Sequence, residues 1–436
     1  MSSISRVVVA ASLLTVGLAT PASAAPPSTG TFSVLTYNVA GLPEGLSSGN
    51  PSANTPLIGA RLGGYDVVHV QEDFNYHAAL YAADAHPYRT PTSGGAGFGD
   101  GLNTLSDYPY SDFVRDDWDA CNGTDCLTPK GFTWSRIRFA EGVYVDFYNL
   151  HPNAGTTDAD LSARRANISE LSAFIQANST GNAVIVTGDT NTRYTRAGDN
   201  IRDLVSANGL TDAWVQAVRG GTPPAAGSDA LVCDDANVTN ACEVVDKILY
   251  RGNRYITLGL DWYNNENAAF RTADDEMLSD HYPIAAGFRW TLNPSLSLSD
   301  AFGGPHGTAF TDVATVPTNQ RVSQVSLRAG SRVDRVGIVV GGASYVHGGT
   351  GGTAASLTLG SGERITSVTL NAGVRDGHTR IFYIRFTTSL GRTLSGGSTT
   401  SDTVTYTAPA GWQISGFHGR SGDEVDKLGV IFTPGS

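Results

Sequence analysis

The sequence predicts two domains, an α/β sandwich followed by an all-β domain. Its 436 residues exceed what a single core usually holds. Short apolar strands alternate with a few helical segments over residues 31–290, whereas strand-like runs separated by glycine pairs fill residues 300–436. The polar, Ser-rich stretch 291–299 lies between the two compositions and is predicted to be a linker.

The strands and helices of the first region are short. Strands are expected at 32–37, 67–70, 143–148, 184–187, 244–250 and 284–290. An amphipathic helix is expected over 163–177 and a shorter one over 201–207, which Asn208-Gly209 ends. The second region shows no long helix, and its strand-like runs are 322–328, 333–340, 355–359, 365–371, 381–387, 404–407, 412–418 and 427–432.

Residues 1–24 are predicted to be a secretory signal peptide. Arg6 precedes an apolar run, Val7 to Ala19, and Ala22-Ser23-Ala24 supplies a small-residue cleavage site. The run is too short for a transmembrane anchor, and no other stretch is long enough to span a bilayer. The protein is therefore expected to be secreted, extracellular and without a transmembrane segment.

Four cysteines agree with export. Cys121 and Cys126 lie five residues apart, and Cys233 and Cys242 nine apart. Four cysteines allow three pairings, and the sequence does not choose among them. Two local disulfide bonds, each closing a loop in an oxidising compartment, are favoured over a metal site, because neither spacing is typical of zinc.

The charge is unevenly distributed. The net charge is −12, with 18 Lys/Arg against 32 Asp/Glu before residue 300 and 11 against 9 from there on. A non-specific nucleic-acid binder needs a basic surface, so the acidic first region disfavours that function. Such a region can still act on an anionic phosphodiester if a divalent cation offsets the repulsion locally.

Polar side chains follow the predicted strands of the first region. A lone carboxylate such as Glu72 suits Mg²⁺, and Asn38, at the end of its own strand, can add a neutral oxygen or hold Glu72. Asp189 and Asn191 are two residues apart, which places both side chains on one side of an extended segment. Asp189 can orient a water, and Asn191 can donate to a phosphoryl oxygen.

Two histidines are predicted to move protons. Asp246 can hold one ring nitrogen of His281, so that the other nitrogen accepts a proton. His151 ends a strand and can donate to a phosphate. Phosphodiester hydrolysis requires charge neutralisation, an activated water and a stabilised leaving oxygen. The candidate residues supply all three.

The order of these groups resembles the endonuclease/exonuclease/phosphatase superfamily, which includes deoxyribonuclease I, neutral sphingomyelinases and inositol phosphatases. The resemblance implies a four-layer sandwich of two mixed β-sheets flanked by helices. It also implies a divalent cation, Mg²⁺ or another, on Glu72 beside Asn38, while Asp280 either touches a second metal or holds its loop. The matching motifs are Leu35-Thr36-Tyr37-Asn38, Gln71-Glu72, Leu150-His151, Gly188-Asp189-Thr190-Asn191, Asp246-Lys247-Ile248 and Ser279-Asp280-His281-Tyr282-Pro283.

The residue roles that this resemblance implies agree with the chemistry above. His281 is the general base, oriented by Asp246, and Asp189 positions the water or helps to deprotonate it. Asn191 and His151 bind the oxygens of the transition state. The motifs do not settle how Asp189 and His281 share the activation of the water.

The secreted bacterial sphingomyelinases look most similar. Residues 126–132 resemble their Lys-Gly-Phe segment, and residues 101–109 resemble the segment before it. The resemblance implies hydrolysis of a phospholipid headgroup, of sphingomyelinase or phospholipase C type. Their aromatic-tipped hairpin is shorter and polar here, so membrane contact by Trp262 and Tyr263 competes with packing in the core. A secreted nuclease remains an alternative, because Asp-His-Tyr-Pro occurs in nucleases as well.

Residues 300–436 resemble jacalin-related lectins. The resemblance implies a β-prism of three four-stranded sheets and a glycan as partner, which would dock the enzyme on glycan-bearing surfaces. The sugar loop would be Gly422-Asp423-Glu424-Val425-Asp426, with Gly304 lining the pocket and Asp426 facing sugar hydroxyls. A prism that has lost sugar binding, or a carbohydrate-binding chain with a spent catalytic domain, are the alternatives. The matching residues are Phe302-Gly303-Gly304, Phe310-Thr311-Asp312, residues 347–352, Gly362-Glu363 and residues 416–422.

Overall fold

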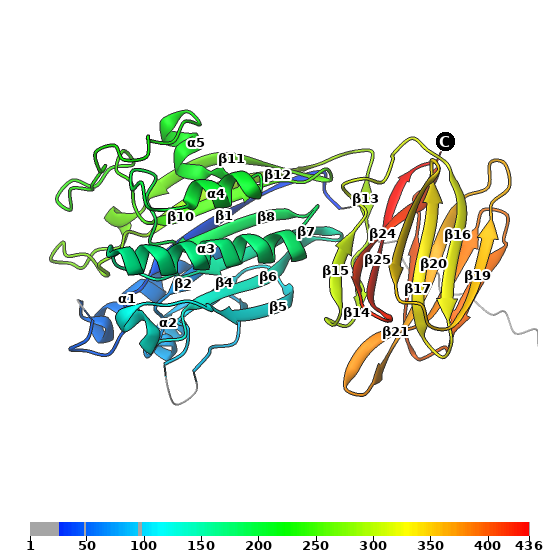
Figure 1. Ribbon diagram of the computed structural model, residues 1–436, viewed down its shortest axis with the longest axis horizontal. Coiled ribbons are helices and arrows are strands. Elements are labelled where there is room, and N and C mark those ends of the chain that lie inside the picture. Colours follow the sequence, from blue (N-terminus) through cyan, green and yellow to red (C-terminus); the bar gives the residue numbers. More distant parts are fainter. Residues whose placement is uncertain (1–25, 48, 95–97, 436) are drawn as a thin grey trace, which may run out of the picture.

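The computed structural model describes residues 26–47, 49–94 and 98–435. These residues form two domains that lie side by side along the long axis (Figure 1). The predicted signal peptide, residues 1–24, lies outside the described residues. No helix in the described part of the chain has the length and apolar character that a bilayer crossing requires.

The first domain contains two six-stranded sheets. Both sheets mix parallel and antiparallel neighbours: β1 is parallel to β2 and β7 is parallel to β8, whereas β12 and β10 run antiparallel to their partners. The first sheet has the order β11 (Ile256–Asn265), β12 (Ile284–Leu292), β1 (Thr29–Asn38), β2 (Val67–Gln71), β4 (Asn103–Ser106), β3 (Tyr88–Arg89). The second has the order β5 (Tyr110–Asp117), β6 (Gly131–Ala140), β7 (Val143–Leu150), β8 (Ala183–Asp189), β10 (Asp246–Arg251), β9 (Thr211–Asp212).

The strands of this domain are apolar on both faces because both faces are covered. On β1, Val34 packs in the core between the two sheets, while Leu35 and Tyr37 pack outward against α1 (Pro51–Leu62) and α2 (His77–Ala83). The apolar side of α3 (Asp158–Asn178), the predicted amphipathic helix, covers the second sheet through Ile168 and Leu171. The order helix, sheet, sheet, helix confirms the four-layer sandwich.

The two predicted helices are present, with one difference in length. Helix α3 begins five residues before the predicted start, because Thr157 and Asp160 form a capping box. Helix α4 (Ile201–Ala207) has the predicted bounds. The remaining helices are α5 (Ala213–Arg219) and the 3₁₀ turns Gly123–Leu127 and Asn267–Ala269.

The second domain consists of three antiparallel sheets around one core, as the β-prism prediction required. The first sheet has five strands instead of four, because β13 joins its edge. Its strands are β13 (Ser297–Leu298), β25 (Val425–Pro434), β24 (Trp412–Ser421) and β15 (Thr308–Thr311), with β14 (Phe302–Gly303) beside β25. The second has β18 (Ala343–Gly348), β17 (Val333–Val340), β16 (Val322–Ala329) and β19 (Thr353–Thr358). The third has β22 (Thr393–Gly397), β21 (His378–Thr388), β20 (Ile365–Arg375) and β23 (Asp402–Thr407).

Most of the predicted linker, residues 291–299, is part of the folded domains. Strand β12 extends to Leu292, and β13 pairs with β25 from Ser297 onward. Leu296 and Leu298 are buried, and they join the same core cluster as Val313 and Ile431 of the second domain. The alternating leucines explain why this segment is ordered: their burial fixes it against both domains.

Polar contacts also hold the two domains together. Asp300 accepts hydrogen bonds from Arg138 Nη2 at 2.8 Å, Gly142 N at 2.9 Å and Tyr144 Oη at 2.7 Å. Lys427 forms a buried ion pair with Asp112. These residues of the first domain lie at the end of its sheets opposite the carboxyl ends of β1, β2, β7 and β8 (Figure 1).

Candidate active site

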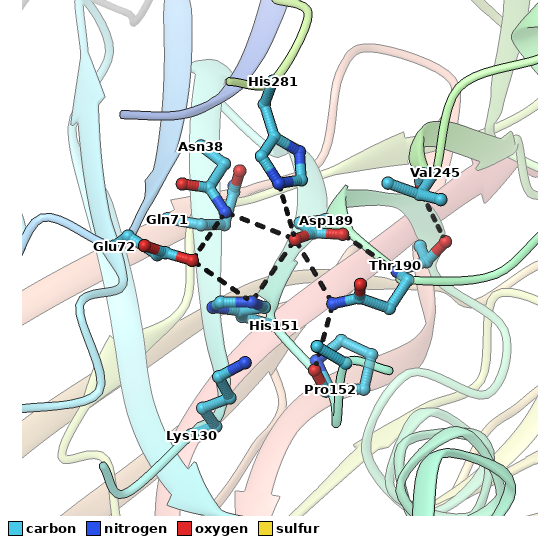
Figure 2. Close-up of polar contacts among 12 residues, drawn as sticks. Asn38, Gln71, Glu72, Lys130, His151, Pro152, Asp189, Thr190, Val245 and His281 are labelled. Atoms are coloured by element: carbon cyan, nitrogen blue, oxygen red, sulfur yellow. Dashed lines mark hydrogen bonds and ion pairs between the residues drawn. The ribbon is translucent and has the colours of Figure 1, made fainter. Parts of the chain in front are cut away.

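The carboxyl ends of the central strands bring the predicted catalytic residues together (Figure 2). The parallel pair β1–β2 aligns Asn38 with Gln71, immediately before Glu72. The parallel pair β7–β8 aligns Leu150 with Gly188, so His151 and Asp189 follow side by side. Strand β10 begins with Asp246 opposite Asp189. The cluster is therefore a product of sheet register rather than of closeness in sequence.

Asp189 is the centre of this cluster. Its Oδ2 atom lies 3.3 Å from His151 Nε2 and 3.6 Å from His281 Nε2. The side-chain amides of Asn38 and Asn191 each donate to Oδ2 at 3.3 Å, and Asn191 N donates to Oδ1 at 2.9 Å. Burial alone would raise the pKa of Asp189, but His281, His151 and Lys130 together lower it. Asp189 is therefore ionised and can align a water.

The predicted pair of His281 and Asp246 is present. His281 Nδ1 lies 3.1 Å from Asp246 Oδ2, which leaves Nε2 facing Asp189. Burial opposes protonation of His281, but Asp246, Asp189 and Asp280 raise the pKa of its ring well above the ordinary value. Burial also raises the pKa of Asp246, against the opposing charge of His281. The ring is thus held in one orientation, with one nitrogen free for proton transfer.

Glu72 and Asn38, the residues predicted to hold a cation, lie side by side. Asn38 Nδ2 donates to Glu72 Oε1 at 3.1 Å, and His151 Nε2 lies 3.8 Å from the same oxygen. Glu72 has a left-handed backbone with a φ of 57°, an uncommon conformation for a residue with a side chain. Its carboxylate is one-fifth exposed, so an ion can reach it. A carboxylate beside an amide fits a hard divalent cation such as Mg²⁺.

Two further observations concern metal binding. Asp189, Asp246 and His281 offer ligand atoms that all lie within 4.8 Å of one another. Because the Asp246 carboxylate already holds His281 Nδ1, this group fits proton transfer better than a metal cage. Asp280 is exposed, and Ser279 Oγ lies 3.4 Å from its carboxylate. Its assignment to a metal remains a prediction.

A buried polar layer supports the cluster from below. Gln71 Nε2 donates to Asn149 Oδ1 at 2.7 Å and to Thr36 Oγ1 at 3.0 Å. Asn149 Nδ2 donates to Val70 O at 3.0 Å, so the layer joins the two sheets. The sequence contained a signal for these residues, namely amide side chains inside otherwise apolar strands, but it did not reveal that they face one another.

Lys130 is a functional candidate that the sequence reasoning did not place in the site. Figure 2 shows its side chain extending toward His151. Its Nζ atom lies 2.9 Å from Asp125 Oδ1, and Asp125 belongs to the loop that the Cys121–Cys126 disulfide bond closes. Both predicted local disulfide bonds, this one and Cys233–Cys242, are present.

The two aromatic residues considered for membrane contact differ in their exposure to solvent. Trp262 on β11 is 42% exposed, and its indole lies over Gly287. Tyr263 is buried in the core between the sheets. Only Trp262 is therefore available at the surface.

In the second domain, the predicted sugar loop meets Gly304 as expected. Gly304 N donates to Asp426 O at 2.8 Å. Burial raises the pKa of the Asp426 carboxylate, and Arg380 Nε lies 3.5 Å from its Oδ1. Arg332 and Arg380 hold the Glu424 carboxylate, whereas Asp423 is exposed and Gly422 N donates to Glu424 O at 3.0 Å. Glu424 thus braces the loop through its side chain.

Comparison with known families agrees with both domains. Residues 56–217 match the family model of the Endonuclease/Exonuclease/phosphatase family 2, and residues 299–431 match that of the Jacalin-like lectin domain. The first range includes Glu72, His151 and Asp189. Asn38, Asp246 and His281 lie outside it.

Curated relatives include proteins named sphingomyelinase from Mycobacterium tuberculosis and Mycobacterium bovis. Each is 42% identical over 276 residues, which are 61% of this chain and 54% of the relative. The chain therefore spans about half the length of the curated relatives it matches.

Solved structures similar to each domain were also found. Sphingomyelinase C from Streptomyces griseocarneus is 20% identical and covers 59% of this chain and 99% of its own, with a TM-score of 0.41. A Staphylococcus aureus beta toxin variant with bound magnesium ions is 18% identical over 59% of this chain and 99% of its own, with a TM-score of 0.43. Malaysian banana lectin is 25% identical over 32% of this chain and 98% of its own, with a TM-score of 0.29. The chain is thus similar to the Endonuclease/Exonuclease/phosphatase family 2 over residues 56–217 and to the Jacalin-like lectin domain over residues 299–431.

Proposed function

We propose that the protein is a secreted, divalent-cation-dependent phosphodiesterase of the sphingomyelinase or phospholipase C type. The observation that carries this proposal is the cluster of His281, Asp246, Asp189 and His151 at the strand ends, beside Glu72 and Asn38. The identity of 42% to mycobacterial sphingomyelinases supports a lipid headgroup as the substrate. The acidic charge before residue 300 also fits a lipid headgroup better than a nucleic acid.

The geometry suggests how the residues divide the chemistry. Asp189 and the free Nε2 atom of His281 face each other, so a water held between them can lose its proton to His281 as it attacks phosphorus. Asp246 keeps the imidazole in orientation and stabilises the imidazolium that forms. His151 and Asn191 donate toward the phosphoryl oxygens, whose charge grows in the transition state.

Glu72 and Asn38 would hold the cation, which would neutralise phosphate charge and offset the carboxylates that raise the pKa of His281. The protein contributes the fixed position of these ligands. Asn38 is anchored by a hydrogen bond from Ala40 N to its Oδ1 at 3.0 Å, and it bridges Glu72 and Asp189.

The lectin domain would bind glycans on the surface that carries the lipid. Docking raises the local concentration of substrate. The disulfide bonds support a secreted location, because such bonds persist in oxidising compartments. Trp262, exposed on β11, supports a peripheral contact with the membrane.

The test is release of phosphocholine from sphingomyelin in mixed micelles, with and without EDTA. We expect turnover by the wild type that EDTA abolishes and Mg²⁺ restores. Supercoiled plasmid serves as the parallel substrate. Cation-dependent nicking without phosphocholine release would replace the lipid substrate with a nucleic acid.

A further inference from the structure

A row of buried polar side chains lies directly below the candidate active site. The four central strands β1, β2, β7 and β8 carry these side chains on the faces between the two sheets, one to three positions before the site residue at each strand end. Farther along the same faces, the side chains are apolar and belong to the core between the sheets. The polar residues are Thr36, His69, Gln71, Asn149 and Thr187, and the apolar ones are Val34, Val67, Phe147 and Ile185.

Gln71 and Asn149 join the two sheets directly. Gln71 Nε2 donates to Asn149 Oδ1 at 2.7 Å, and Asn149 Nδ2 donates back to the first sheet, to Val70 O at 3.0 Å and Asn103 O at 3.2 Å. Gln71 Nε2 also donates to Thr36 Oγ1 at 3.0 Å, so β1 belongs to the same network. One pair of amide side chains thus connects strands β1, β2 and β4 of the first sheet to β7 of the second.

His69 and Thr187 make a second connection of the same kind. His69 Nδ1 lies 2.7 Å from Thr187 Oγ1, and both side chains are buried. Burial lowers the pKa of His69 to about 3, so the ring is neutral and the contact places no charge between the sheets. This bond joins β2 to β8, two residues before Asp189.

The candidate active site is divided between the two sheets. Asn38 and Glu72 follow strands of the first sheet, and His151 and Asp189 follow strands of the second. Within the site, the contacts across this division are long: 3.3 Å from Asn38 Nδ2 to Asp189 Oδ2 and 3.8 Å from His151 Nε2 to Glu72 Oε1. Apolar packing between the sheets is non-directional, whereas a hydrogen bond restricts both distance and angle. The short bonds below the site therefore restrict the spacing of its two halves more tightly than the contacts within it.

We propose that Gln71 and Asn149 are positioning residues that set the distance between Glu72 and the pair of His151 and Asp189. Gln71 directly precedes Glu72, and Asn149 lies two residues before His151, so their hydrogen bond acts on the site through the backbone. A displacement of about 1 Å between groups that act on the same phosphate lowers the rate by about 100-fold. This inference rests on the proposed phosphodiesterase function.

Exchanging the two amide side chains tests the pair. Gln71→Asn shortens one partner by a methylene group and Asn149→Gln lengthens the other, so each single variant loses the match in length. The double variant restores the combined length between the two strands. Each single variant should lower kcat for phosphocholine release by about 100-fold, whereas the double variant should return to within about tenfold of the wild type.

Two calorimetric titrations separate positioning from a general loss of structure. Mg²⁺ alone should bind each single variant within about threefold of the wild-type affinity, because both predicted cation ligands, Asn38 and Glu72, lie on the first sheet. Inorganic phosphate, added in saturating Mg²⁺, contacts groups from both sheets. Its affinity should fall by at least about tenfold in each single variant and recover in the double variant.

Tyr148 offers a matched control on the same strand. It is fully buried and directly precedes Asn149, but its hydroxyl lies 2.6 Å from Ser179 Oγ and its ring packs against Phe174 of α3, on the opposite face of β7. Tyr148→Phe removes a buried hydrogen bond that does not connect the two sheets. It should lower the melting temperature while leaving turnover and phosphate affinity near the wild-type values.

Phosphate affinity that is equal in the wild type and both single variants would overturn the positioning role, and so would a double variant no better than the weaker single variant. A wild type that binds Mg²⁺ and phosphate but releases no phosphocholine would remove the lipid substrate, while the phosphate titrations would still support or overturn the positioning role. A folded wild type that binds neither Mg²⁺ nor phosphate would overturn both the proposed function and this inference.

Discussion

The two ends of the α/β sandwich both hold buried charges, but the two ends differ in how these charges are paired. At the strand ends that form the candidate active site, the buried atoms Asp246 Oδ1 and His151 Nδ1 make no hydrogen bond within the described residues. At the opposite end, Lys427 pairs with Asp112, and Arg138 pairs with Asp300. The first cluster retains buried atoms that can still form hydrogen bonds to a ligand. The charges of the second cluster pair with each other and join the two domains.

Removing His281 should have the largest effect at the active-site end. His281→Ala should lower kcat/KM for sphingomyelin by about 1,000-fold or more, because both proton transfer and the charge beside Asp189 are lost. Initial rates of phosphocholine release at equal protein concentration measure this loss. The melting temperature should change little.

His86 offers a matched control. Its Nδ1 atom lies 2.5 Å from Asp84 Oδ1, so it forms another histidine–aspartate pair in the same domain, away from the strand ends that form the active site. His86→Ala should lower stability while leaving the turnover of folded protein near the wild-type value. Equal losses of turnover in the two variants would contradict the assignment of His281.

Breaking the buried pair at the other end should affect stability instead. Lys427→Met removes the ion pair of the buried Asp112 carboxylate and leaves Arg136, 3.8 Å away, as its remaining ion-pair partner among the described residues. We expect a loss of about 3 kcal/mol in the free energy of unfolding, measured by urea denaturation.

The double variant Lys427→Met with Asp112→Asn should recover much of that loss, because no uncompensated charge remains. Asparagine also tolerates the left-handed backbone of Asp112, whose φ is 57°. A double variant no more stable than Lys427→Met would show that packing, rather than charge, accounts for the effect.

The domain interface should also respond to pH through His418. Burial, followed by the nearby charge of Arg136, lowers the pKa of His418 to about 4, and its ring nitrogen donates to Ser299 O at 3.0 Å. The histidine of the unfolded chain titrates near about 6.5. The buried, neutral His418 therefore contributes fully to the free energy of unfolding above about pH 6.5, and this contribution is lost as the pH falls toward 4. The loss should be about 2 to 3 kcal/mol.

Melting temperatures between pH 7 and pH 4 measure this dependence. His418→Gln should flatten the curve in that window relative to the wild type. Burial also lowers the pKa of His69, beneath the candidate active site, to about 3. His69 therefore also destabilises the fold as the pH falls, so part of the pH dependence of the melting temperature should remain in the variant. A variant curve parallel to that of the wild type would exclude His418 as a source.

The smallest expected effect is at Asp300. Asp300→Asn keeps the shape of the side chain but weakens the contacts with Arg138, Gly142 and Tyr144. We expect a loss of about 1 to 2 kcal/mol by urea denaturation, with turnover unchanged. A loss of turnover without a loss of stability would show that this interface communicates with the active site.

Prediction from sequence succeeded where the signal was local. The apolar runs located the strands, the periodicity of Ile168, Leu171 and Ile175 located α3, and cysteine spacing favoured the two observed disulfide bonds. The pairing of His281 with Asp246 was inferred from the residues and agreed with the family resemblance, and the contact of 3.1 Å in the structure confirms it. The β-prism was predicted from the resemblance of the second region.

Other features had no local signal. Nothing in the polar segment 291–299 indicated that Leu296 and Leu298 pack against the second domain, because their partners, such as Ile431, lie far along the chain. The position of Lys130 beside His151 required the fold of the loop that the Cys121–Cys126 bond closes. The braces from Arg332 and Arg380 to Glu424 depend on contact between hairpins of different sheets.

The sequence by itself determined the two domains, their fold classes and which residue types could carry the chemistry, because apolar spacing and short motifs are properties of neighbouring residues. Only the tertiary structure decided which of these residues meet. Strand register set Asp189 against Asp246, and the packing of three sheets brought Arg332 and Arg380 against Glu424. Both outcomes depend on contacts between distant segments, whose free energy no single segment contains.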